Sequence, residues 1–419
     1  MTTNDPRQLI VLCDGTNNTL TGGTHDTNLV KLLEHLRAQP KDPHKIIFYD
    51  PGVGSTGSLP AVTWFDEVKQ GTQRLIGLAL GGGIYENMAQ SYAFLMRNYR
   101  EGDQIYFFGF SRGAFTARSV AGLVNQFGLL QPQMEHMIPT LVQLYFSKRN
   151  HSLGAQKVED VVGQIKQNLA NASSREVEIQ YVGVWDTVAS VGIWPMDLKM
   201  TSKPTVQGKH FLNVRHAMAL DEHRAQFKVR PYLDDNTTDT FKYQSKSGKP
   251  VSLIQQWFPG SHCDVGGGND KSQTTLSNLA LDWLVDEAIG CGLRLAPINS
   301  AAASPAETRP IHSQIYASPI WAITGLHQRD ANHMQVDKQT SNPFAETTYP
   351  LHPVAHENAL YNDFSFAKST PWILMRSIRP ALAALLVMVL AYVMMRFASP
   401  RWALVINFLW IGGYAYILG

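Results

Sequence analysis

Residues 104–118 read QIYFFGFSRGAFTAR: an apolar run, a Gly-x-Ser-x-Gly turn and a stretch with helical character. Two glycines, Gly109 and Gly113, flank Ser111, and in so tight a turn a side chain at either glycine would clash with neighbouring backbone. A strand that turns this sharply into a helix is the setting of a nucleophile elbow, which raises a serine above the sheet near a helix N-terminus. The stretch therefore predicts an α/β fold and makes Ser111 a candidate nucleophile.

Other apolar runs have the same unbroken composition and alternate with helical patterns. The runs are Leu9–Cys13, Lys45–Tyr49, Val177–Val184 and Leu253–Trp257, and the helical patterns are Asn28–Gln39, Ile84–Tyr99 and Gly113–Phe127. Strands without polar alternation are typical of a sheet that helices cover on both faces. The alternation predicts an α/β fold with a doubly wound, mainly parallel sheet and helical insertions.

The bulk composition is that of an ordinary globular protein. Of 419 residues, 44% are hydrophobic and 17% are charged, and the net charge of +2 does not favour a nucleic-acid partner. Cys13, Cys263 and Cys291 are too few and too far apart to indicate a disulfide framework or a metal-binding pair. The N-terminus lacks a basic region followed by a long apolar stretch, so we expect synthesis in the cytoplasm without a signal peptide.

The segment 371–419 differs from the rest of the chain. It has no acidic residue and contains two uncharged apolar runs, Pro380–Met395 and Trp402–Gly419, with arginine and tryptophan near their ends. These residue types at segment ends suit a membrane interface. We interpret the segment as a membrane-inserting helical hairpin, with a pair of buried core helices as the alternative.

We accordingly divide the chain into three units. Residues 1–299 form the expected catalytic domain, within which 129–175 is a candidate cap over the site. Residues 300–370 form a loop-rich extension, and residues 371–419 form the apolar helical segments.

Small polar or glycine-rich clusters follow the predicted strands. They occupy residues 13–17, 50–54, 109–113, 185–187 and 258–268. Because the carboxyl ends of parallel strands meet at one edge of the sheet, where ligands bind in open α/β folds, we expect these clusters to converge.

A serine needs an adjacent base to act as a nucleophile, and that base needs an orienting acid. His262 is the best-placed base, since it follows the last predicted strand in a glycine-rich loop. In the hydrolase order of serine, acid and histidine, Asp186 and Asp221 both qualify as the acid, and Asp186 is favoured because it ends a strand. Asp264 is a third option, better suited to supporting the loop.

The oxyanion of an acyl-transfer reaction needs two preorganised donors. One is expected from the backbone N–H of Arg112, and the other from the loop at Gly15 and Thr16, which Asp14 would hold through its side chain. Gly52–Gly54 is a second source for that donor. Three arginines are candidate contacts for a substrate phosphate: Arg112, Arg118 and Arg224.

The remaining histidines do not indicate a metal. His216 and His223 lie in what reads as a helical pattern and are interpreted as structural or supporting residues. His352 and His356 have the spacing of helical metal ligands, but Pro353 lies between them and there is no obvious third ligand. We expect neither a metal nor a cofactor.

Six motifs occur in one order along the chain: CDGTNN, PGVGS, FGFSRGAFTAR, GVWDTVASVG, RHAMALDEHRAQF and WFPGSHCDVGGG. Together, over roughly residues 7–295, they resemble the α/β-hydrolase family that includes type VI secretion phospholipase effectors. The resemblance implies a serine esterase acting on glycerophospholipids through a Ser-His-Asp triad, with Ser111 as nucleophile and His262 as base. The acid stays open, because the segments that carry Asp186 and Asp221 both match the family.

The resemblance also implies partners and a destination. It implies delivery by a secretion apparatus into a rival cell, a phospholipid membrane as the target, and a neutralising immunity protein in the producer. The apolar tail departs from the many relatives that are longer and soluble. A general esterase or thioesterase acting on soluble acyl substrates, and an inactive membrane-anchored binding protein, are the alternatives.

Overall fold

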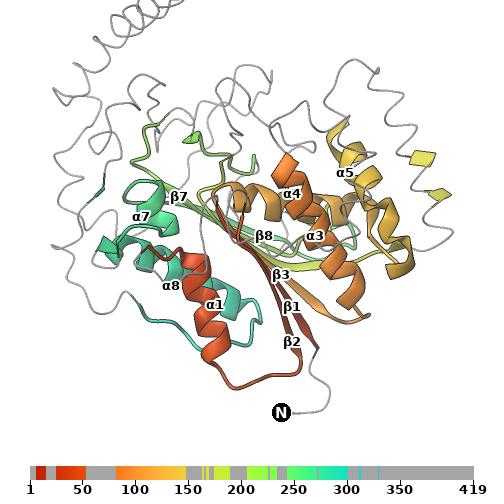
Figure 1. Cartoon of the computed structure of the whole chain (residues 1–419), viewed down its shortest axis with the longest axis horizontal. Coiled ribbons are helices and arrows are strands. Elements are labelled where there is room, and N and C mark those ends of the chain that lie inside the picture. The colour runs from red at the N-terminus through yellow and green to blue at the C-terminus, as the bar shows by residue number, and fades with distance from the viewer. Residues whose placement is uncertain are drawn as a thin grey trace, which may run out of the picture.

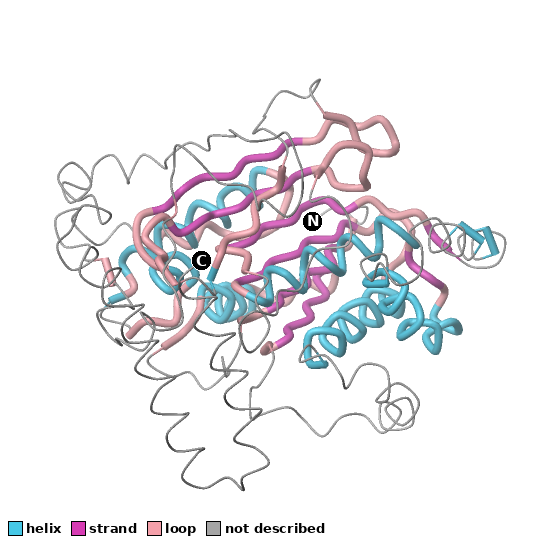
Figure 2. The backbone as a smooth tube through the Cα atoms, turned by 90° about the horizontal axis from the view of Figure 1, so that it is seen from above, coloured by secondary structure: helices cyan, strands magenta, loops and turns pink. Residues whose placement is uncertain are grey.

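A computed structural model describes residues 6–15, 25–52, 82–147, 163–164, 167–168, 174–188, 205–224, 227–233, 243–270, 273–300, 311–312 and 329. Its centre is a six-stranded sheet in the order β2-β1-β3-β6-β7-β8, in which every neighbouring pair is parallel. The strands lie side by side in Figure 2. They are β1 (Gln8–Cys13), β2 (Lys45–Asp50), β3 (Gln104–Phe110), β6 (Ile179–Trp185), β7 (Asn213–Ala219) and β8 (Ser252–Phe258).

Helices cover both faces of the sheet (Figure 1). One face packs against α3 (Gly82–Asn98), α4 (Arg112–Phe127) and α5 (Ile138–Ser147), and the other against α1 (Asn28–Ala38) and α8 (Thr275–Gly290). Alternate residues of β1 divide between the two cores: Leu9 and Val11 face the first, Ile10 and Leu12 the second. Because both faces are buried, the strands read as unbroken apolar runs, and the predicted doubly wound α/β class is confirmed.

The direction of the strand order reverses beside β1. The strands β2 and β3 flank β1 on opposite sides, so the chain leaves the end of β1 toward one side of the sheet and the end of β3 toward the other. In open parallel sheets such a switch point is where ligands bind, just beyond the carboxyl ends of the strands. Ser111 directly follows β3 at this point.

One predicted element is wrong. The stretch that includes His216 reads as helical, but Asn213–Ala219 is a strand, β7, between β6 and β8. Val214, Ala217 and Met218 mimic the stripe of a helix, and a strand buried on both faces shows no polar alternation that would reveal it. Arg215 and His216 are tolerated there because Glu287 pairs with Arg215 and Gln255 lies 3.4 Å from His216.

The segment 129–175 is only partly described. After the short strand β4 (Leu129–Leu130), the 3₁₀ helix η1 (Pro132–Met137) and α5 pack near α3, and β5 (Ser174–Arg175) pairs antiparallel with β4. Residues 148–162, 165–166 and 169–173 lie outside the described residues, and the cap stays a prediction.

The predicted tail 371–419 also lies outside the described residues. Among the helices that are described, none combines the length and the apolar character needed to cross a bilayer.

Candidate active site

Ser111 lies on a strained turn between β3 and α4. Its backbone has φ 60° and ψ −124°, a conformation that non-glycine residues rarely adopt. A Cβ at Gly109 would lie 2.6 Å from the Cα of Ala114, and a Cβ at Gly113 would lie 2.1 Å from the carbonyl oxygen of Cys13. Both clashes are with backbone, so the two glycines are required for the turn to form.

The same turn is held against the neighbouring strands. The Ser111 N–H donates to the carbonyl oxygen of Trp185, the last residue of β6, at 3.1 Å. The close approach of Gly113 to Cys13 brings the start of α4 onto the end of β1. As expected, the segments that follow β1, β3 and β6 therefore meet at one edge of the sheet.

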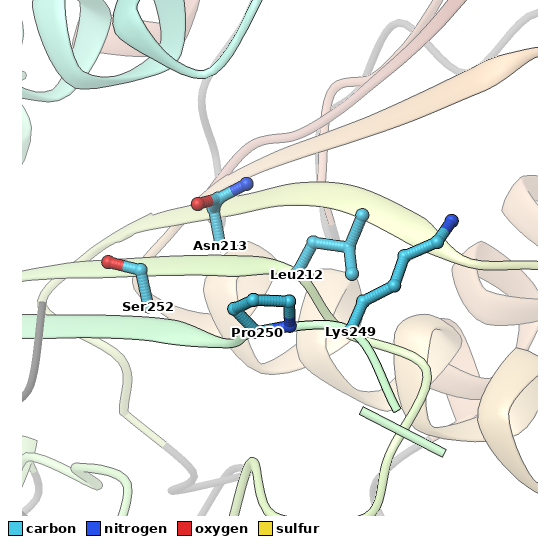
Figure 3. A pocket seen from close by; sticks show the side chains of 5 residues that line it. All are labelled: Leu212, Asn213, Lys249, Pro250 and Ser252. Carbon is cyan, nitrogen blue, oxygen red and sulfur yellow. The ribbon is translucent and has the colours of Figure 1, made fainter. Parts of the chain in front are cut away.

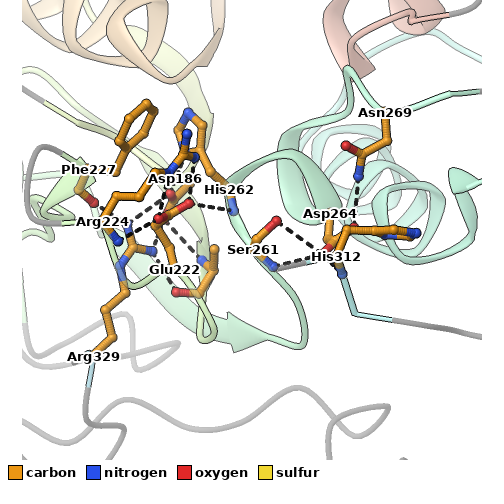
Figure 4. Close-up of polar contacts among 11 residues, drawn as sticks. Asp186, Glu222, Arg224, Phe227, Ser261, His262, Asp264, Asn269, His312 and Arg329 are labelled. Atoms are coloured by element: carbon orange, nitrogen blue, oxygen red, sulfur yellow. Dashed lines mark hydrogen bonds and ion pairs between the residues drawn. The ribbon is translucent and has the colours of Figure 1, made fainter. Parts of the chain in front are cut away.

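An aspartate and a histidine form a buried pair at this edge. Asp186 directly follows β6, and its Oδ2 lies 2.6 Å from Nδ1 of His262, the first residue of the short helix α7 (His262–Gly266) (Figure 4). Asp186 is fully buried and has φ 37°. Three non-glycine residues in the described ranges have positive φ, and two of them are Ser111 and Asp186. Backbone strain of this kind gathers at functional sites.

The imidazole of His262 is enclosed by aromatic rings. The ring centroid of Phe110 lies 4.7 Å from that of His262, and the centroid of Phe227 lies 4.9 Å away in an edge-on arrangement. Since Phe110 directly precedes Ser111, this packing places His262 beside the serine turn. No hydrogen bond joins Ser111 Oγ to His262 in the described part of the chain, and nucleophile–base hydrogen bonds often tighten only when substrate binds.

The other two candidate acids have different partners. Asp221 accepts the N–H of Gly260 through Oδ2 at 2.6 Å and so braces the turn before His262. Asp264 accepts the backbone N–H and the hydroxyl of Ser261 and pairs with His312 at 2.6 Å. Asp264 therefore supports the loop, as the sequence indicated.

The pair has an electrostatic setting that favours the charged acid and the neutral base. Burial alone would raise the pKa of the Asp186 carboxyl, but the Arg329 guanidinium and the His262 hydrogen bond outweigh it and hold that pKa below its usual range. Burial lowers the pKa of the His262 imidazole, although Asp186 acts in the opposite direction. An ionised Asp186 can only accept, so the His262 proton resides on Nδ1 and Nε2 is available as a base.

The loop expected to supply an oxyanion donor is described as far as Gly15. The Gly15 N–H donates to Oδ1 of Asp14 at 2.6 Å, so in this structure that donor is engaged within its own loop. Oδ2 of Asp14 accepts the hydroxyls of Thr27 and Tyr49, which fix the loop as the sequence predicted for Asp14. Thr16 lies outside the described residues. Arg112 begins α4, where a backbone N–H has no intrahelical acceptor.

Two of the three arginines expected to contact a substrate phosphate are committed elsewhere. Arg118 is 2% exposed, donates to the carbonyl oxygen of Arg230 and stacks on Tyr232 at 4.0 Å. Arg224 is 6% exposed and forms a double hydrogen bond with Glu222. Neither guanidinium is presented to a substrate, and the expectation for both is wrong.

The protein also has a pocket of about 300 Å³, and Figure 3 shows the side chains that line it. Asn213 and Ser252, which begin β7 and β8, line it together with Leu212, Lys249 and Pro250. Because parallel strands all point the same way, this pocket lies at the amino end of the sheet, opposite Ser111.

Within the described ranges no group of histidine, cysteine or acidic side chains could hold a metal ion.

Two groups around His262 were not predicted from the sequence. Glu222 accepts the backbone N–H of His262 at 3.3 Å, and Arg329 pairs with Asp186. Glu222 lies inside the motif RHAMALDEHRAQF, so its position was a usable signal. Arg329 lies in a stretch of no recognisable pattern, and only the folded chain reveals it.

The parallel sheet, the serine on its strained turn and the Asp186–His262 pair define a doubly wound α/β protein with a hydrolase-type serine turn. The family model described as "T6SS, Phospholipase effector Tle1-like, catalytic domain", where T6SS is the type VI secretion system, matches residues 7–287. The chain belongs to this family.

Two further proteins are similar to the chain. The uncharacterized protein YEL023C of Saccharomyces cerevisiae is 27% identical over 406 residues, covering 69% of this chain and 58% of that protein. The crystal structure of an uncharacterized protein from Pseudomonas aeruginosa matches with a TM-score of 0.38 and 15% identity, covering 90% of this chain and 53% of the other. The chain thus spans little more than half the length of each.

Proposed function

We propose that the protein is a serine esterase that hydrolyses acyl esters of glycerophospholipids. The observation that carries the proposal is the 2.6 Å hydrogen bond between Asp186 and His262 at the sheet edge where Ser111 occupies its strained turn. Membership of a phospholipase effector family supports the lipid as substrate. Of the two acids left open by the sequence, Asp186 is favoured, because it contacts the imidazole and Asp221 contacts Gly260.

The proposed reaction follows from these positions. Ser111 Oγ attacks the ester carbonyl carbon while His262 Nε2 takes the hydroxyl proton, and Asp186 stabilises the imidazolium that forms. The Arg112 N–H supplies one oxyanion donor, and the N–H of Thr16 is the candidate for the second. The alcohol leaves with the proton from His262. Water then attacks the acyl-serine, releasing the fatty acid and restoring the hydroxyl.

The setting of the enzyme is part of the same proposal. Family membership supports delivery by type VI secretion machinery, and we propose that the enzyme acts on the phospholipid membrane of a recipient cell. An immunity protein in the producing cell would then protect its own membranes.

Fatty-acid release from phospholipid vesicles tests the proposal. We expect Ser111→Ala to lower the rate by at least about 10³-fold, because the nucleophile and its base act as a unit. Ser119→Ala is the matched control: it removes from α4, the helix that follows Ser111, a buried hydroxyl that has no hydrogen-bond partner among the described residues, and it should keep the rate.

A short soluble ester, assayed in parallel, separates the candidate functions. Turnover of the soluble ester alone would favour a general esterase over a lipase. If Ser111→Ala kept full activity on both substrates, the assignment of the nucleophile would be wrong.

A further inference from the structure

Arg329 forms a forked ion pair with the acid of the site (Figure 4). Its Nη1 lies 2.6 Å from Oδ1 of Asp186 and its Nη2 lies 3.0 Å from Oδ2. The two residues are 143 positions apart in the sequence, and the side chains of both are essentially buried. A bidentate pair of this kind fixes the plane of a carboxylate as well as its charge.

The same guanidinium connects the segments that surround His262. Nη1 also donates to the carbonyl oxygen of Ala219, the last residue of β7, at 2.5 Å. Nη2 also donates to the carbonyl oxygen of Phe227, whose ring packs edge-on against the imidazole. Arg329 thus ties the end of β7, the Phe227 segment and Asp186 to one group.

The carboxylate of Asp186 is fully occupied. Oδ1 accepts the N–H of Ala219 at 3.0 Å and one Arg329 N–H, and Oδ2 accepts His262 Nδ1–H and the other Arg329 N–H. A carboxylate offers about four acceptor positions, and these four donors use them. The acid cannot rotate away from His262 without breaking several charge-assisted hydrogen bonds.

We propose that Arg329 is a positioning residue of the active site: its guanidinium holds Asp186 as a fixed, charge-compensated acceptor for His262, so that His262 remains an unprotonated base in mildly acidic solution. This inference rests on the proposed function, since it assigns His262 the role of base. Arg329 lies beyond residues 7–287, the part of the chain that the family model matches.

The charges around His262 explain why loss of the Arg329 charge should favour the protonated imidazole. Asp186 and Glu222 are acidic and Arg224 and Arg329 are basic, so the four groups cancel. The paired Asp264 and His312 lie on the other side of the His262 loop, and the half-buried Cys263 thiol, whose pKa is raised to about 12, stays neutral. Loss of the Arg329 charge would leave the negative charge of Asp186 uncompensated beside the imidazole. That charge would favour the protonated form of His262.

The pH dependence of kcat/KM on a soluble short-chain ester tests the proposal in the full-length protein. For Arg329→Met, we expect the acid limb of the profile to move to higher pH by at least about 1 unit, the lower end of the effect of one nearby charge. Arg329→Lys keeps the charge and loses the fork, so its acid limb should stay in place while kcat falls about tenfold.

His312→Asn is the matched control. It removes a second contact from the same region of the chain, the pair with Asp264, and leaves Asp186 untouched. We expect a profile like that of the unaltered protein. If His312→Asn shifted the acid limb as Arg329→Met does, the effect would come from anchoring of the chain rather than from charge, and the proposal would be wrong.

Titration of the His262 imidazole by NMR, with ¹³C-labelled histidine, gives a readout that needs no catalysis. A raised His262 pKa in Arg329→Met, in a protein inert toward esters, would support the role of Arg329 and refute the proposed function. Ester hydrolysis that depends on Ser111, with an unchanged His262 titration in Arg329→Met, would support the function and refute the role of Arg329.

If Arg329→Met does not fold, Arg329→Lys decides. An unchanged kcat in Arg329→Lys would show that the fork is not needed, and would overturn the proposal.

Discussion

The candidate site consists of a few residues held in conformations that their neighbours enforce. Ser111 and Asp186 both have positive φ, and each directly follows a strand that the core fixes in place. Such backbone strain costs of order 1–3 kcal/mol per residue and persists only where surrounding contacts over-determine it. At Ser111 those contacts include the close approach of Gly113 to the backbone of β1.

Gly113→Ala tests this dependence. The added Cβ would lie 2.1 Å and 2.3 Å from the carbonyl oxygens of Cys13 and Asp14, and backbone cannot move aside as a flexible side chain can. We expect a loss of about 1–3 kcal/mol in the free energy of unfolding and a fall in esterase activity of at least tenfold, measured by denaturation and by ester hydrolysis.

Gly290→Ala is the control for that prediction. Gly290 ends α8, and nothing lies within 4 Å of the Cβ position there, so this variant should be neutral or slightly stabilised. Equal stability of Gly113→Ala and the unaltered protein would contradict the account of the turn.

At the scale of elements, the carboxyl ends of the strands lie at one edge because the strands are all parallel. The strand β7 also contributes hydrogen bonds to the segment that carries Asp186. Its Ala219 N–H holds Asp186, and its His216 accepts the N–H of Thr187 through Nε2 at 3.1 Å. The segment that carries Asp186 is therefore braced by β7 on both sides. His216 supports that segment as a buried, neutral group.

The buried His216 predicts a pH dependence of stability. Burial lowers its pKa from 6.5 to about 3, so between these values the unfolded chain binds a proton that the native state does not. Stability is therefore lost as the pH falls below about 6.5. For His216→Gln we expect this loss to be absent, a relative difference of at most about 2 kcal/mol at pH 5.

Chemical denaturation of both proteins between pH 5 and pH 7 measures that difference. The two must be compared with each other, because burial raises the pKa of Asp50 to about 7 and its titration changes stability in the opposite direction. Parallel pH profiles for the variant and the unaltered protein would count against a neutral, buried His216.

At the scale of the whole molecule, the candidate site draws on residues from 14 to 329. The match to the effector family covers residues 7–287, yet Arg329, which lies beyond that part of the chain, pairs with Asp186. The part of the chain that follows the family domain therefore contributes to the site as well as leading toward the apolar tail.

The tail gives a prediction that the full-length protein can test. Leu386→Arg places a charge in the middle of the run Pro380–Met395, where insertion into a bilayer costs about 2.5–3.5 kcal/mol more. We expect weaker sedimentation with phospholipid vesicles and slower vesicle hydrolysis, with unchanged turnover of a soluble ester. Unchanged vesicle binding would argue for the alternative of buried core helices.

Much of the fold was predictable because its signals are local. An unbroken apolar run, a glycine pair around Ser111 and a cluster after each strand report on neighbouring residues and on the direction of a parallel sheet. The placement of Ser111 and His262 at one edge follows from those signals. The strand β7 was not predictable in this way, since its apolar residues fit a helical stripe and its buried Arg215 and His216 are satisfied by distant partners.

The sequence by itself determined the class of fold, the serine turn and the short set of groups that could act with it, because these depend on composition and spacing over a few residues. Only the tertiary structure decided which acid contacts His262, that the Gly15 N–H is already occupied, and that Arg329 faces Asp186 across 143 residues. The physical reason is that a hydrogen bond requires distances near 3 Å, and residues far apart in the chain reach them only through packing of the whole domain.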